Sequence, residues 1–349
     1  MKNEPLYKTI KNHLLKLIQE NRNDKNYILP SESQLCLKFN VSRVPIRKAL
    51  DQLQKEGYII KKQGKGSFIN TELSLGIFAG KQQRLIALIL PDISTPFLQN
   101  ITLGIRKYCD ETKSNYILLP SFSSTATEQK NIHLAKKLSC DGILLMPVDG
   151  ESYNDALLEL IVEKTPCIFI DRHLVGLNIP SVSSDHLQMG YEATKRLLDR
   201  GFDKIAYFAQ TDAITSVNER AQGYIKALTE QGKPKQYLIN LSGKNHKTLH
   251  EQLEYYLRKT PEINGIIINS GISAANAIRA INAIGKNLDE HFGMVCFDEN
   301  NFLIDLCLNI KLDSIIQDSF KIGYTAAKLL INQLNHGILP AAKTIIPLL

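Results

Sequence analysis

The 349-residue chain contains 44% hydrophobic and 22% charged residues, proportions that exclude a disordered or fibrous protein and leave room for two or three globular domains. It has no apolar run long enough to cross a membrane, and lysines interrupt its N-terminus, so we expect neither a membrane anchor nor a signal peptide. Its six cysteines form no CxxC pair, which favours reduced, buried thiols in the cytoplasm over a metal site or disulfides.

The net charge of +7 is concentrated at one end of the chain. Residues 1–70 carry 14 Lys+Arg and 6 Asp+Glu, a balance of +8, whereas the remainder carries 28 and 29, a balance of −1. A cationic excess on one small segment suits the phosphates of a nucleic acid. We therefore expect residues 1–70 to bind DNA and the remainder to have another role.

Two helices are predicted before residue 40. Apolar residues at helical spacing indicate the first over residues 5–19. Ser31 and Gln34 have the spacing of a capping box, which predicts that the second helix begins just after Ser31. We expect this helix to bury Leu35, with Leu37 as a second candidate for the core.

A third helix follows a tight turn at Asn40, a residue that tolerates left-handed backbone. Ser42 is the expected N-cap, and Arg43 and Arg47 lie near the start of the helix, where recognition helices present residues to DNA. Its apolar stripe has the helical i, i+3, i+4, i+7 spacing and consists of Ile46, Ala49, Leu50 and Leu53.

A short basic hairpin completes the module. Residues 58–60 and 67–69 read as two strands, and the segment between them has the sequence KKQGKG. Its glycines permit a tight tip, and its lysines place positive charge there. The order helix, turn, helix, hairpin is that of a winged helix-turn-helix.

Four motifs in this order, LPSE, VSR, RKAL and QGKGSF, make the segment similar to the winged helix-turn-helix of the GntR family of bacterial transcription regulators. The resemblance implies DNA contacts from the recognition helix and the wing. Pro45 stands where the family commonly has a threonine that reaches a phosphate, so that hydroxyl contact is lost. The DNA-binding candidates are Ser31, Ser42, Arg43, Pro45, Arg47, Lys48, Lys62, Lys65 and Gly66. A basic helix hairpin without a DNA role is the alternative, which the ordered motifs disfavour.

Residues 71–83 read as a linker, and the pattern changes at Arg84. From there, short apolar runs alternate with longer segments of helical spacing, which predicts parallel sheets covered by helices on both faces. The expected strands are LIALIL, NYILLP, GILLMP, CIFIDR, IAYFA, GIIIN and GMVCF. The expected helices are 97–112, 127–139, 153–164, 188–200, 219–231, 247–259 and 273–285. The fold class is therefore α/β, with residues 84–349 forming two doubly wound lobes for effector binding and dimerisation.

Ligands of such sheets bind beyond the carboxyl ends of the strands. The residues that follow the predicted strands, or open the next helix, are carboxylates, arginines, amides and one aromatic, a set that suits a polyhydroxylated ligand. The effector-binding candidates are Asp92, Phe97, Asp171, Arg172, Arg220, Asn269, Asp298 and Gln317. We expect Arg220 to open the helix after IAYFA. Asp171 and Arg172 also admit the simpler interpretation of an ion pair at a strand end.

The segments PDISTPF, DRH, SSDHLQMGYEAT, RAQGY, CFDE and SIIQDSFKIGYTAAKLL make residues 84–337 similar to the effector domain of the LacI/GalR regulators, a periplasmic-binding-protein-like fold. The resemblance implies that Arg220 and Asp298 hold ligand hydroxyls, that Phe97 lines the pocket, and that Asn269 and Gln317 complete it. It gives Asp185 a structural role near the hinge. The chain departs from the family at His186, where asparagine is frequent, and at Ile316, near a common arginine.

The combined expectation is a ligand-responsive transcription regulator rather than an enzyme. The sequence has no GxSxG, HExxH, P-loop or GxGxxG motif in a suitable place, no metal-ligand spacing among its histidines, and no implied cofactor. We expect a cytoplasmic homodimer that binds a two-fold symmetric operator. By resemblance, it is a repressor, and a monosaccharide of the arabinose or fucose type releases it from the operator. Two alternatives stay open, namely a non-sugar effector such as a purine and an enzyme that uses the cleft.

Overall fold

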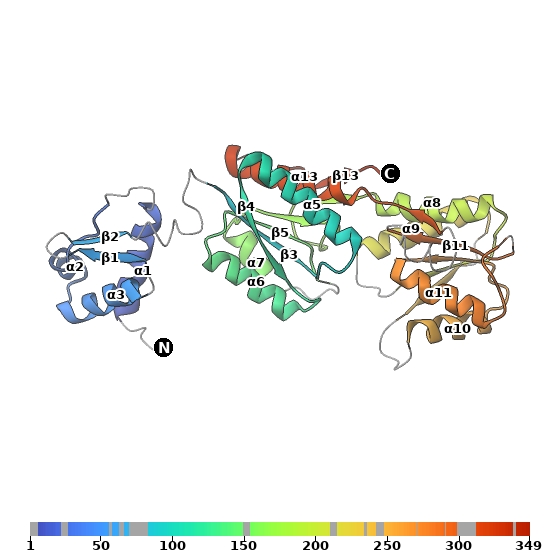
Figure 1. The fold of residues 1–349 in the computed structure, drawn as a ribbon, viewed down its shortest axis with the longest axis horizontal. Helices are drawn as coiled ribbons and strands as arrows, with labels where there is room; N and C mark the ends of the chain where they lie inside the picture. Colours follow the sequence, from blue (N-terminus) through green and yellow to red (C-terminus); the bar gives the residue numbers. More distant parts are fainter. Residues whose placement is uncertain are drawn as a thin grey trace. The chain divides into compact units, whose positions relative to one another are not determined.

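The computed structural model describes residues 6–21, 27–55, 58–62, 66–69, 83–148, 154–209, 215–233, 236–241, 248–269, 271–289, 291–298, 312–337 and 340–349. The chain divides into two compact units, Met1–Gln83 and Arg84–Leu349 (Figure 1). The predicted linker over 71–83 lies outside the described residues except for Gln83.

The N-terminal unit has three helices and a two-stranded wing. The helices are α1 (Leu6–Glu20), α2 (Glu32–Phe39) and α3 (Arg43–Lys55), and the antiparallel strands are β1 (Ile59–Lys62) and β2 (Gly66–Ile69). The capping box at Ser31 is present, and Asn40 ends α2 with left-handed backbone at φ 53°. Leu35 is fully buried, but Leu37 is 84% exposed, because residues two apart on a helix face opposite sides.

The larger unit contains two parallel sheets, which confirms the predicted fold class. The first lobe holds β3 (Leu85–Leu90), β4 (Asn115–Pro120), β5 (Gly142–Leu145), β6 (Cys167–Ile170), β7 (Ser181–Ser184) and β13 (Lys343–Ile346), in the order β13-β7-β6-β5-β3-β4. The second holds β8 (Ile205–Ala209), β9 (Tyr237–Asn240), β10 (Gly265–Ile268), β11 (Gly293–Phe297) and β12 (Asp313–Ile315), in the order β12-β11-β10-β8-β9.

Helices cover both faces of each sheet (Figure 1). In the first lobe, α5 (Pro96–Thr112) and α13 (Ser319–His336) lie on one face, and α6 (Thr125–Lys137) and α7 (Asp155–Val162) lie on the other. In the second lobe, α8 (His186–Asp199) and α9 (Thr215–Glu230) lie opposite α10 (Leu249–Lys259) and α11 (Gly271–Ala283). Strands such as β3, β5 and β10 are therefore buried at every position.

Among the described residues, the chain crosses between the lobes after β7 and again after β12. It leaves the first lobe after β7 and enters α8 at His186, and it returns from β12 through Gln317 into α13. The C-terminal residues close back on this return segment, because Gln317 bridges Leu348 and the Leu349 amide donates to the carbonyl of Ile316 at 3.2 Å. His186 and Gln317 thus lie where the two lobes are joined.

The sequence predicted seven strands of this unit and missed β7, β9, β12 and β13. The predicted helices are present with ends shifted by a few residues. One expectation was wrong: α9 begins at Thr215, so Arg220 lies in its second turn and does not open the helix.

Candidate effector site and nucleic-acid interface

Two aspartates at strand ends, one from each lobe, form the centre of the candidate effector site. Asp171 follows β6 and Asp298 follows β11, and both have left-handed backbone, with φ of 63° and 66°. This conformation is costly for a residue with a side chain and persists where the surroundings enforce it. The enforcing contacts come from the crossover segments and from α9.

His186 connects the two lobes at this point. Its ring is 1% exposed, and its Nε2 lies 2.9 Å from the carbonyl oxygen of Asp171 and 3.4 Å from Asp171 Oδ1. On the other side of the ring, Arg220 Nε donates to His186 Nδ1 at 3.3 Å. The burial of Asp171 alone would raise its pKa, but His186 and Arg220 hold the pKa below its ordinary value.

Arg220 is itself held from several directions. Its guanidinium lies 4.5 Å from the ring centre of Phe297, and Nη2 lies 4.0 Å from Asp298 Oδ1. The same Oδ1 accepts a hydrogen bond from Gln317 Nε2. Burial raises the pKa of Asp298, and Arg220 and Gln317 act against that rise.

Close packing of α8 on α9 fixes the backbone under these side chains. A Cβ at Gly190 of α8 would lie 1.8 Å from the carbonyl oxygen of Arg220, and a Cβ at Gly223 of α9 would lie 2.0 Å from that of Leu187. Only glycine permits this approach. The position of Arg220 relative to His186 is therefore set by main-chain contact as well as by hydrogen bonds.

Arg172 belongs to a buried network of the first lobe. Its Nη1 donates to the carbonyl of Pro147 at 3.3 Å, and its Nε lies 3.8 Å from Asp171 Oδ2. Asp171 and Arg172 therefore form the ion pair that the simpler interpretation expected, and Arg172 has a main-chain contact in addition. Burial and the neighbouring Arg220 lower the pKa of Arg172 to about 10. Glu128 of α6 supports the same region, since its carboxylate accepts from Val148 N at 2.8 Å and from Asn154 Nδ2 at 2.7 Å.

Asn269 follows β10 and is engaged within the second lobe. Its Oδ1 accepts from the Tyr207 hydroxyl at 2.8 Å, and its Nδ2 donates to the carbonyl of Phe208 at 3.3 Å. Asp92 and Phe97 lie at the end of β3 and the start of α5. Asp92 accepts two hydrogen bonds from Ser94, and Phe97 packs against the first-lobe core.

The structure thus brings together Asp171, Arg172, Arg220, Asp298 and Gln317. None of the contacts described above joins Asn269, Asp92 or Phe97 to this cluster. Sequence reasoning missed two residues, His186 and Glu128. His186 did carry a signal, because it departs from the family pattern next to Asp185. Asp185 proves to be the N-cap of α8, where its Oδ1 accepts from Gln188 N.

In the N-terminal unit, the predicted recognition helix exposes its basic residues. Arg43 and Lys48 are exposed, as are Ser42 before the helix and Arg47 one turn into it. Arg47 Nε donates to Glu32 at 2.9 Å, with 59% of the arginine side chain exposed, and Lys48 Nζ lies 4.3 Å from the Tyr7 ring centre. Such exposed pairs contribute little to stability and leave the cations available to phosphates.

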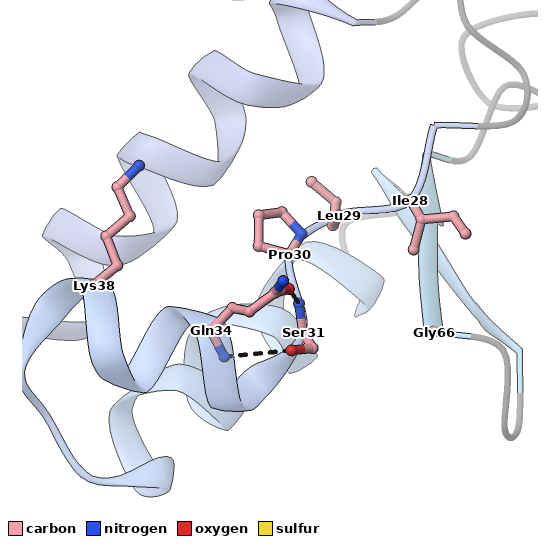
Figure 2. A pocket seen from close by; sticks show the side chains of 7 residues that line it. All are labelled: Ile28, Leu29, Pro30, Ser31, Gln34, Lys38 and Gly66. Atoms are coloured by element: carbon pink, nitrogen blue, oxygen red, sulfur yellow. Dashed lines mark hydrogen bonds between the residues drawn. The ribbon is translucent and has the colours of Figure 1, made fainter.

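A groove runs between the start of α2 and the wing. It has a volume of about 750 Å³ and is lined by Ile28, Leu29, Pro30, Ser31, Gln34, Lys38 and Gly66 (Figure 2). Gly66, with φ of 104°, starts β2, and the amide of Leu29 donates to the carbonyl of Ser67, so the wing is tied to this entry segment. Two DNA-binding candidates, Ser31 and Gly66, therefore meet at one groove.

The remaining candidates have separate surroundings. Pro45 is partly buried in the first turn of α3, and Lys62 Nζ lies 4.9 Å from the ring centre of Phe68. Lys65 lies outside the described residues. No metal-binding group of three or more His, Cys, Asp or Glu occurs among the residues that the structure describes. Within the same residues, no helix is long and apolar enough to span a membrane.

Comparison with known proteins agrees with this architecture. Residues 83–348 match the family of periplasmic binding proteins and sugar binding domain of LacI family, and residues 6–69 match bacterial regulatory proteins, gntR family. The arabinose metabolism transcriptional repressor of Halalkalibacterium halodurans is 27% identical over 311 residues, which are 86% of this chain and 82% of the relative. This relative spans both the DNA-binding and the effector regions.

Solved structures share the fold of the larger unit. The transcription regulator CcpA of Lactococcus lactis aligns with a TM-score of 0.67 at 22% identity, over 77% of this chain and 97% of that one. A LacI family regulator from Enterococcus faecium with bound ribose aligns with a TM-score of 0.62 at 22% identity, over 76% and 96%. The chain therefore belongs to the family of periplasmic binding proteins and LacI-type sugar binding domains, here preceded by a DNA-binding module of the bacterial gntR regulatory family.

Proposed function

We propose that this protein is a cytoplasmic repressor of a sugar-utilisation operon, and that a monosaccharide bound at the Asp171–Arg220–Asp298 cluster changes its affinity for operator DNA. The observation that carries the proposal is the meeting of two strand-end carboxylates, one from each lobe, with Arg172 beside the first and Arg220 of α9 beside the second. No catalytic step is assigned to this cluster. The repressor acts as a homodimer on a two-fold symmetric operator, because one small reader gives limited specificity.

The chemistry of the cluster favours an uncharged polyol. Within the described residues, Gln317 Oε1 is a buried acceptor without a hydrogen-bond partner, and the His186 Nε2–H near Asp171 Oδ1, at 3.4 Å, is directed to the Asp171 carbonyl instead, while the arginines supply donors. A sugar hydroxyl donates to the first kind of group and accepts from the second. The phosphoryl group of a phosphate ester carries a charge of about −1.5 to −2 and three acceptor oxygens, so it would be repelled by the carboxylates of Asp171 and Asp298.

The relatives supply the first sugars to test. The similar protein of Halalkalibacterium halodurans is an arabinose metabolism repressor, and the Enterococcus faecium structure holds ribose. These names support a pentose effector of the arabinose or ribose type, and the fucose type rests on the family resemblance alone. A ligand that contacts Asp171 of one lobe and Asp298 of the other favours a closed arrangement of the lobes, which is the source of the change in DNA affinity.

A thermal-shift screen tests the sensor proposal. A sugar at one hundred times its Kd stabilises the folded state by about 2.7 kcal/mol, which corresponds to a rise in Tm of roughly 5–10 °C for a unit of this size. The screen contains pentoses, hexoses, deoxyhexoses, their phosphates and purines, with Asp298→Asn as the variant that should lose the response. A selective rise with a purine or with a phosphate ester would contradict the sugar proposal.

An operator-release assay tests the regulatory step. The sugar found in the screen should raise the Kd for operator DNA in the wild-type protein and leave the Kd of Asp298→Asn unchanged. An operator affinity that is equal with and without the bound sugar would refute the proposed repression relieved by ligand.

A further inference from the structure

His186 contacts both sides of the candidate effector site, although the sequence offered no role for it. It is the first residue of α8, and it lies directly after the crossover from the first lobe, one residue beyond the N-cap Asp185. Its ring is 1% exposed, so both ring nitrogens need partners within the protein. Those partners belong to different lobes.

The two partners determine where the proton of the ring lies. The carbonyl oxygen of Asp171, 2.9 Å from Nε2, can only accept a hydrogen bond, so Nε2 carries the proton. Arg220 Nε, 3.3 Å from Nδ1, can only donate, so Nδ1 presents its lone pair. The neutral Nε2–H tautomer satisfies both contacts, whereas a proton on Nδ1 would point at another N–H group.

Arg220 has four supports, Gly190, Phe297, Asp298 and His186, of which His186 is the one that itself contacts the other lobe. Gly190 holds its main chain, and Phe297 lies under its guanidinium at 4.5 Å. Both of these lie in the second lobe. The hydrogen bond from Arg220 Nε to His186 therefore fixes the position of the guanidinium relative to the carbonyl of Asp171, which follows β6.

We infer that His186 is a positioning residue of the effector site, which holds Arg220 in line with Asp171 and thereby sets effector affinity. The inference rests on the proposed function for its effect on sugar binding, but the hydrogen bonds themselves are testable without a ligand. Asparagine at this position carries a donor and an acceptor, but its shorter side chain does not reach the position of Nε2, so it cannot make both contacts at once. The titratable and charged groups around the ring are Asp171 after β6, Arg220 of α9, Asp298 after β11 and His173, whose pKa burial lowers.

The first experiment uses the full chain without ligand. Nitrogen-15 NMR of histidine-labelled protein at pH 7.5, with the His186 signals assigned by their absence in His186→Asn, should show the neutral Nε2–H tautomer. Arginine-labelled protein should show a slowly exchanging Arg220 Nε–H that exchanges faster in His186→Asn. An Nδ1–H tautomer or a cationic ring would overturn the inference, and so would an Arg220 exchange rate that the substitution leaves unchanged.

The second experiment measures L-arabinose and D-ribose affinity by calorimetry, together with the urea midpoint. His186→Asn should weaken sugar binding about tenfold or more, the size of one lost hydrogen bond to a charged group. The exposed His336, at the end of α13, provides the matched control His336→Asn, which should bind like the wild type. Wild-type affinity in His186→Asn would overturn the inference. Absence of sugar binding in the wild type would instead refute the proposed function, and the NMR result would still decide the positioning contact.

Discussion

The substitution Gly190→Ala tests whether the packing of α8 on α9 determines the position of Arg220. A Cβ at residue 190 would lie 1.8 Å from the carbonyl oxygen of Arg220, 2.6 Å from its carbonyl carbon and 2.8 Å from its Cα. All three contacts are with main chain, which cannot rotate away. The two helices must therefore separate by about 1 Å or more before the methyl group fits.

The expected cost follows from this displacement. Overpacking a tight interior typically lowers the free energy of unfolding by about 1–3 kcal/mol, and each kcal/mol corresponds to roughly 2–4 °C in Tm for a unit of this size. The same displacement moves Arg220 relative to His186 and Asp298. We therefore expect sugar affinity to fall on the order of tenfold in addition to the loss of stability.

The first lobe provides a matched control for the steric change. A Cβ at Gly104 of α5 would lie 2.0 Å from the carbonyl oxygen of Phe320 on α13, a clash of the same kind at a helix pair that carries neither Arg220 nor His186. Gly104→Ala should show a similar fall in the urea midpoint with wild-type sugar affinity. Equal affinities for the two variants, measured by calorimetry at a temperature where both are folded, would refute the argument that the α8–α9 contact positions Arg220.

Three further predictions concern single groups. Arg47→Ala should weaken operator binding and reduce the slope of the logarithm of the binding constant against the logarithm of the salt concentration by about 1. The control Arg106→Ala, which removes an exposed arginine of α5, should change neither the affinity nor the slope. An unchanged slope in Arg47→Ala would show that Arg47 is not part of the DNA interface. Asp298→Asn should flatten the dependence of the free energy of unfolding on pH above pH 3.8. Burial raises the pKa of the Asp298 carboxyl, so its contribution to stability falls as pH rises through the raised pKa of the folded state. Urea titrations at several pH values measure this dependence, and a profile like that of the wild type would contradict the raised pKa. Glu128→Gln should lower the free energy of unfolding by about 1–3 kcal/mol, since an amide would oppose one of the two donors at Val148 N and Asn154 Nδ2; an unchanged urea midpoint would show that the carboxylate is not needed there.

The fold was largely predictable because parallel strands that are covered on both faces are continuous apolar runs. The strand β3, LIALIL, is such a run and is buried at all six positions. The strand β7, SVSS, is equally buried but reads as a polar loop, and no hydrophobic pattern marks it. Its pairing with β6 and β13 is a tertiary property, which local sequence does not encode.

Five of the predicted effector residues, Asp171, Arg172, Arg220, Asp298 and Gln317, meet in the candidate site, but the hydrogen bonds that connect them were not predictable. Strand ends identify Asp171 and Asp298, because ligands of doubly wound sheets bind there. His186 lies in sequence beside Asp185, for which the family resemblance implied a structural role near the hinge, and no role was predicted for His186. What makes the histidine part of the site is its distance of 2.9 Å from a carbonyl fifteen residues earlier, which only the crossing of the chain from one lobe to the other produces.

The location of these residues at the crossovers explains how a small ligand can change DNA affinity. Reversing a two-state population from about 1:99 to 99:1 requires about 5.5 kcal/mol of differential binding. Hydrogen bonds to charged groups contribute about 1.5–3 kcal/mol each, so two to four contacts made in only one lobe arrangement are sufficient. Asp171, Arg220 and Asp298 offer that number, and His186 and Gln317 join them to the two crossover segments. In the proposed function, a ligand that orders these side chains therefore acts on the two crossover segments that join the lobes.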